Sequence, residues 1–104
     1  MLIDEILELL SAPSAASSRP LLERVDATLT DGYAEALQLE AERRRIEVRI
    51  AEVVAGLSDK TSHRHEPELV ALSEKLMSAN ADIASLRTLL TSLRDRRTEL
   101  RSAA

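Results

Sequence analysis

Two long runs of this chain place apolar side chains at alternating spacings of three and four residues. The first run contains Leu22, Val25, Leu29, Gly32, Ala36, Leu39, Arg43, Ile46, Ile50, Val53 and Leu57. The second contains Leu69, Leu72, Leu76, Ala79, Ile83, Leu86, Leu90, Leu93, Arg97 and Leu100. Such sustained heptads give each helix one apolar face and are typical of helices packed as a coiled coil. The polar connection between the runs is short, so the sequence predicts two antiparallel neighbours.

The composition supports an all-α fold. The 104 residues include one aromatic side chain, Tyr33, and only two glycines, which are too few for the turns of a β-sandwich or barrel. The sequence predicts a long antiparallel coiled-coil helical hairpin with a short N-terminal helix, completed as a four-helix bundle by dimerisation. The predicted parts are a docking helix over 1–10, a flexible linker over 11–19, and a hairpin over 20–104. Within the hairpin we expect helices at about 20–59 and 67–102 and a turn at about 60–66.

Gly32 admits two interpretations. Thr30-Asp31-Gly32 resembles a turn, and Asp31 could cap a new helix that begins at Tyr33. The heptad phase nevertheless runs across Gly32 without a slip, which favours one continuous helix.

The apolar faces of the two helices meet along a seam. The charged residues beside this seam discriminate between possible registers of the two helices. In the favoured register Gly32 faces Arg97, and every flanking pair is of opposite sign. Those pairs are Asp26 with Arg101, Glu40 with Arg87, Glu35 with Arg96, and Arg49 with Asp82. Sliding the helices by one heptad sets Glu42 against Asp82 and Arg49 against Lys75, so the sequence disfavours that register.

Two sets of residues are candidates for binding a partner. The side of the first long helix opposite its seam carries small or apolar residues, which allow another helix to approach closely; they are Ala34, Leu37, Ala41, Val48 and Ala55. The N-terminal helix is too short to be stable alone in water, so we expect it to dock through Leu2, Ile3, Ile6, Leu7 and Leu10. A thin two-helix hairpin buries little surface, and we therefore expect a homodimer, with another helical protein as a further possible partner. Glutamate in place of Ala41 should then weaken association.

No pattern in the sequence indicates catalysis. His63, His65 and Glu66 form a small cluster in the predicted turn, but zinc normally takes three or four protein ligands and only Asp59 is an obvious addition. A solvated turn is the better interpretation, and we expect no metal, no cofactor and no enzymatic activity. The net charge of −4 and the lack of stacking aromatics argue against nucleic-acid binding.

The N-terminal apolar stretch is interrupted by Asp4, Glu5 and Glu8 and has no basic residues before it, so we expect neither a cleaved signal nor a membrane span, and a cytoplasmic protein. The chain is similar in size and outline to small helical hairpins that bacteria secrete through specialised export systems. Those proteins carry Trp-x-Gly in the turn, where Ser58 to Glu66 stand here, and no family is assigned. The sequence favours a non-enzymatic assembly or adaptor module. An export-type or chaperone-type hairpin that holds a partner protein is the alternative, and a nucleic-acid accessory protein is a distant third.

Overall fold

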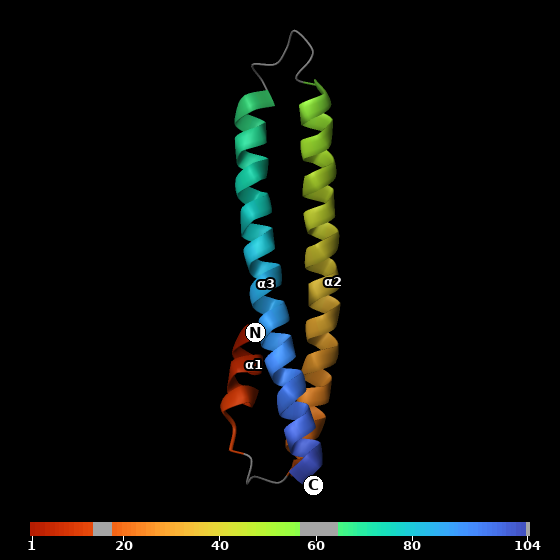
Figure 1. Cartoon of the computed structure of the whole chain (residues 1–104), viewed down its shortest axis with the longest axis vertical. Helices are drawn as coiled ribbons and strands as arrows, with labels where there is room; N and C mark the ends of the chain where they lie inside the picture. The colour runs from red at the N-terminus through yellow and green to blue at the C-terminus, as the bar shows by residue number, and fades with distance from the viewer. Residues whose placement is uncertain (14–17, 57–64, 104) are drawn as a thin grey trace. The chain divides into compact units, whose positions relative to one another are not determined.

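The computed structural model describes residues 1–13, 18–56 and 65–103, and its elements are all α-helices, as predicted. They are α1 (Leu2–Ser11), α2 (Ser18–Gly56) and α3 (His65–Ala103) (Figure 1). The predicted linker over 11–19 falls in part on 14–17, and the end of the helix predicted at about 20–59 and the turn over 60–66 fall in part on 57–64; both of these ranges lie outside the described residues. None of the three helices is long and apolar enough to cross a membrane.

Helix α2 is continuous through Gly32, which confirms the interpretation that the unbroken heptad phase favoured. No residue among those described has a positive φ, so Gly32 keeps ordinary backbone geometry. Its role is spatial. Leu90 of α3 lies against the position that a Cβ atom on residue 32 would occupy.

The chain divides into two compact units. Unit 1 comprises Met1–Leu37 and Ala84–Ala104, and unit 2 comprises Gln38–Ile83. Unit 1 contains α1, the first half of α2 and the last half of α3, whereas the described residues of unit 2 belong to the second half of α2 and the first half of α3. Within each unit the α2 and α3 segments run antiparallel (Figure 1).

Unit 1 has a closed apolar core. Its buried hydrophobic side chains come from all three helices and are Ile6, Leu9, Leu21, Val25, Leu29, Ala36, Leu86, Leu90, Leu93 and Leu100. Leu21 and the buried Thr28 stand one position before the seam residues Leu22 and Leu29, outside the α2–α3 seam.

Polar side chains at both ends of α1 stabilise the first and last turns of this helix. Asp4 and Glu5 lie in its first turn, where carboxylates interact favourably with the helix dipole. At the other end the Ser11 hydroxyl donates to the carbonyl oxygens of Leu7 and Glu8, at 3.0 and 3.1 Å. Ala12 is extended, as expected for a residue that precedes proline, and the helix ends there.

Two arginines connect α1 to the other helices of unit 1. The guanidinium group of Arg96 in α3 donates a hydrogen bond to the carbonyl oxygen of Ala12. Arg24 in α2 forms an ion pair with Glu8, with 3.7 Å between Nη2 and Oε1. The Arg96 side chain is only 13% exposed, so the contact with Ala12 is well shielded from water.

The favoured register of α2 and α3 is wrong by one heptad. In unit 1 Gly32 lies against Leu90 rather than Arg97, and Asp26 pairs with Arg97, at 3.5 Å, rather than with Arg101. The reason is the relative size of the two effects. Burying a leucine side chain contributes about 1.5–3 kcal/mol, whereas an exposed ion pair contributes about 0.2–1 kcal/mol. In the observed register Leu90 fills the space beside Gly32, and weak exposed charge pairs do not determine the register on their own.

Candidate interaction surface

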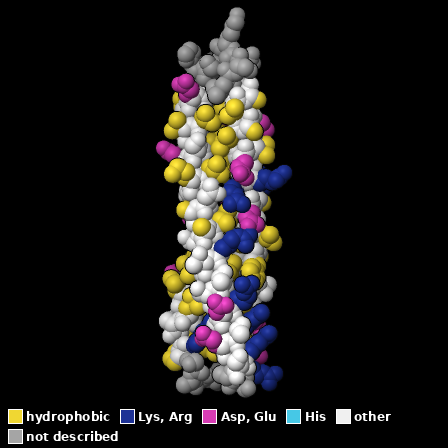
Figure 2. Space-filling model, viewed as in Figure 1, with side chains coloured by type: hydrophobic (Ala, Val, Ile, Leu, Met, Phe, Trp, Pro, Cys, Tyr) yellow, Lys and Arg dark blue, Asp and Glu magenta, His cyan; other side chains and the backbone are white. Residues whose placement is uncertain are grey.

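The seam between α2 and α3 is open in unit 2. Among the described residues of this unit, Val53 and Ile83 are the only buried hydrophobic side chains. The other apolar seam residues, in the same heptad positions that are buried in unit 1, are only half-buried; they are Leu39, Ile46, Ile50, Leu69, Leu72, Leu76 and Ala79. Two helices alone cover each other on one side, so a third element is needed to exclude water from such a seam. Figure 2 shows hydrophobic side chains reaching the surface in the upper half of the view.

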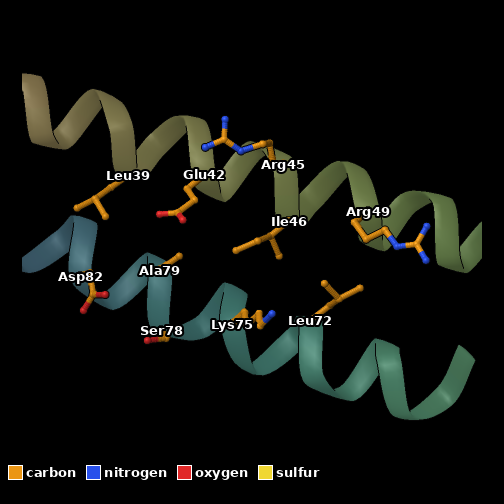
Figure 3. Close-up of a pocket in the computed structure, with 10 residues that line it drawn as sticks. All are labelled: Leu39, Glu42, Arg45, Ile46, Arg49, Leu72, Lys75, Ser78, Ala79 and Asp82. Carbon is orange, nitrogen blue, oxygen red and sulfur yellow. The ribbon is translucent and has the colours of Figure 1, made fainter.

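A groove of about 450 Å³ follows this open seam. Its apolar floor is formed by Leu39 and Ile46 from α2 and by Leu72 and Ala79 from α3, whose side chains extend into the space between the helices (Figure 3). Every residue that lines the groove belongs to unit 2. An apolar floor between two helices is the shape into which the apolar face of a third helix packs.

The rim of the groove is charged, and the sign differs between its ends. Glu42 and Asp82 lie at the end that holds Leu39, whereas Arg49 and Lys75 lie towards the end that holds Leu72 (Figure 3). Among the residues that the structure describes, Glu42, Asp82 and Lys75 form no salt bridge with one another or with other groups. Arg45 also lines the groove, between Glu42 and Arg49 along α2, so one end holds both carboxylates, the other holds Arg49 and Lys75, and a third cation lies between them.

Arg49 also ties α2 to α3 at the basic end. Its Nε donates to the Glu68 carboxylate at 2.7 Å, and its Nη1 donates to Glu52 at 3.2 Å. The hydrogen bond to Glu68, followed by that to Glu52, raises the pKa of Arg49 above its ordinary value. The sequence predicted Asp82 as the partner of Arg49, and the shifted register replaces it with Glu68. The Arg49 side chain is still half-exposed and faces the groove.

Neither a protein-family model, nor a curated protein, nor a solved structure matches the chain.

The predicted outer stripe is exposed along its length. Ala34 and Leu37 lie in unit 1 and Ala41, Val48 and Ala55 in unit 2, all with exposed side chains. In unit 2, Ala41 and Val48 line a shallow hollow of about 550 Å³. The binding role of these residues stays a prediction.

The predicted docking residues of α1 divide into two groups. Ile6 is fully buried, and Leu2 and Leu10 are half-buried, so these three face the interior of unit 1. Ile3 and Leu7 are exposed.

Leu9 is fully buried in unit 1 but was missing from the predicted set. Six of the nine residues over 2–10 are Leu or Ile. In so short a helix this composition does not define a unique inward face.

Of the histidine cluster, His65 begins α3, while His63 and Asp59 lie outside the described residues. No group of three or more metal-ligating side chains occurs within the described part of the chain. Glu66 and Glu68 lie in the first turn of α3, where they interact favourably with the helix dipole.

The groove of unit 2 was not predicted from the sequence. Its signal was present in the disfavoured register, which sets Glu42 against Asp82 and Arg49 against Lys75. These four charges line the groove.

Proposed function

We propose that this chain is a non-enzymatic helical assembly module that binds itself or a partner helix through helix-on-helix packing. The observation that supports the proposal is the contrast between the two units. In unit 1 a third helix is present and the seam is closed, whereas in unit 2 the seam residues are half-buried along a groove with an apolar floor. Covering apolar surface contributes about 25 cal/mol per Å², so this groove favours a bound helix.

A second surface supports the same function. The outer stripe leaves Leu37 and Val48 at 66% and 49% exposure. Small residues at Ala41 and Ala55 would allow the backbone of a partner helix to approach α2. We propose the stripe as a contact for another helical protein.

Light scattering coupled to size exclusion tests the proposed function. We expect the chain at micromolar concentration to have twice its sequence mass of 11.5 kDa, and the apparent mass should fall on dilution because association follows mass action. A mass of one chain over the whole concentration range contradicts self-association.

A further inference from the structure

We propose that the groove of unit 2 binds a second copy of this chain face to face, in antiparallel orientation. The α2 segment of one copy then lies opposite α2 of the other, and α3 lies opposite α3, so that four helical segments enclose one core. This inference rests on the proposed function and adds the partner, the surface and the orientation.

The heptad positions indicate that the groove is a site for a helix. Leu21 and Thr28 are buried in unit 1, and Glu42 and Arg49 stand a whole number of heptads after them. On α3, Arg96 contacts the end of α1, and Asp82 stands two heptads before it. In unit 1 these heptad positions are buried or contact the end of α1, whereas in unit 2 they are exposed and line the groove.

The rim charges determine the orientation of the second copy. Glu42 and Arg49 are one heptad apart on α2, and Lys75 and Asp82 are one heptad apart on α3. One heptad corresponds to about 10 Å along a helix axis. A twofold axis perpendicular to the helices reverses one copy end to end. Asp82 of each copy then faces Lys75 of the other, and Glu42 faces Arg49. Arg45 lies midway between Glu42 and Arg49 and comes next to Arg45 of the other copy, so the four opposite-charge pairs must outweigh this one like-charge contact. A parallel arrangement would bring the two acidic ends together and the two basic ends together.

The same charges favour a second copy over an unrelated helix. Glu42 and Asp82 are like charges at one end of the groove, and neither has a salt-bridge partner among the described residues. The adopted register therefore brings together unpaired carboxylates within one chain. Reversal of an identical copy supplies a cation to each of them, and Arg49 has further N–H donors available besides those bound to Glu68 and Glu52.

Charge exchange between positions 75 and 82 tests the inference. Both side chains are exposed, so Lys75→Glu and Asp82→Lys should fold, as circular dichroism can verify. Each single variant places two like-charged pairs in the dimer, and we expect its dissociation constant to rise by about tenfold or more. Light scattering should show dimers again when the two single variants are mixed, because each substituted position then meets an opposite charge. The double variant Lys75→Glu/Asp82→Lys should also dimerise.

Two controls accompany the exchange. Arg44→Glu changes the net charge as much as Lys75→Glu but lies on α2 outside the groove, and it should keep the dimer mass. Ala41→Glu alters the outer stripe and should keep it too.

The outcomes separate the two proposals. The inference is overturned if both single variants still form dimers, or if Ala41→Glu is the only variant that loses the dimer. Either result leaves self-association standing. A wild-type chain that is monomeric overturns the inference and the self-association part of the proposed function, and it leaves the binding of another helical protein standing.

Discussion

Position 32 shows how the absence of one side chain can determine the alignment of two helices. Gly32 lies in the middle of α2, where glycine costs about 1 kcal/mol relative to alanine. The space it leaves is filled by Leu90, which is only 2% exposed. The heptad spacing predicted the helices and the continuity of α2. It could not predict the register, because shape complementarity between Gly32 and Leu90 is a property of the packed pair and not of either sequence run alone.

A larger residue at position 32 should disturb unit 1 through Leu90. We expect Gly32→Leu to lower the free energy of unfolding by about 1–3 kcal/mol, the usual cost of overpacking. In a Leu90→Ala background that cost should shrink, since the competing side chain is gone. Urea unfolding followed by circular dichroism at one protein concentration measures both. An equal cost in the two backgrounds contradicts the contact between Gly32 and Leu90.

At the scale of elements, α1 illustrates a helix that depends on its neighbours. Ten residues are marginal for an isolated helix in water, and the sequence therefore predicts that this helix docks on other helices. In unit 1 its side chains Ile6 and Leu9 are buried. The inward face was only partly predictable. Ile6 was identified and Leu9 was not, because the choice among closely spaced Leu and Ile residues depends on where α2 and α3 offer space.

Truncation of α1 side chains should separate its buried face from its exposed face. We expect Ile6→Ala to abolish the hydrogen-exchange protection of the α1 amides, since removing a buried Ile side chain costs about 2–5 kcal/mol. Leu7→Ala is the matched control, because Leu7 is one residue away and half-exposed, and it should leave the protection nearly unchanged. Equal loss of protection in the two variants contradicts the observed packing of α1.

At the scale of the whole molecule, the two units differ in how far their apolar seams are covered. Unit 1 closes its own core with α1, whereas unit 2 presents an open groove with an apolar floor and a charged rim. Self-association could be expected from the sequence, because a hairpin buries little surface. The groove could not, since its charges come together only in the register that pairwise charge counting disfavours.

Distances between spin labels on two copies test the antiparallel dimer most directly. The chain contains no cysteine, so Gln38→Cys, Arg44→Cys and Ala51→Cys each provide one labelling site on α2 in unit 2. Pulsed electron resonance should give the shortest distance for position 44. Positions 38 and 51 should give distances longer by about 5–10 Å, because residues away from the centre of an antiparallel pair separate along the axis. Equal distances at all three positions, or no dipolar coupling at any, would contradict the account.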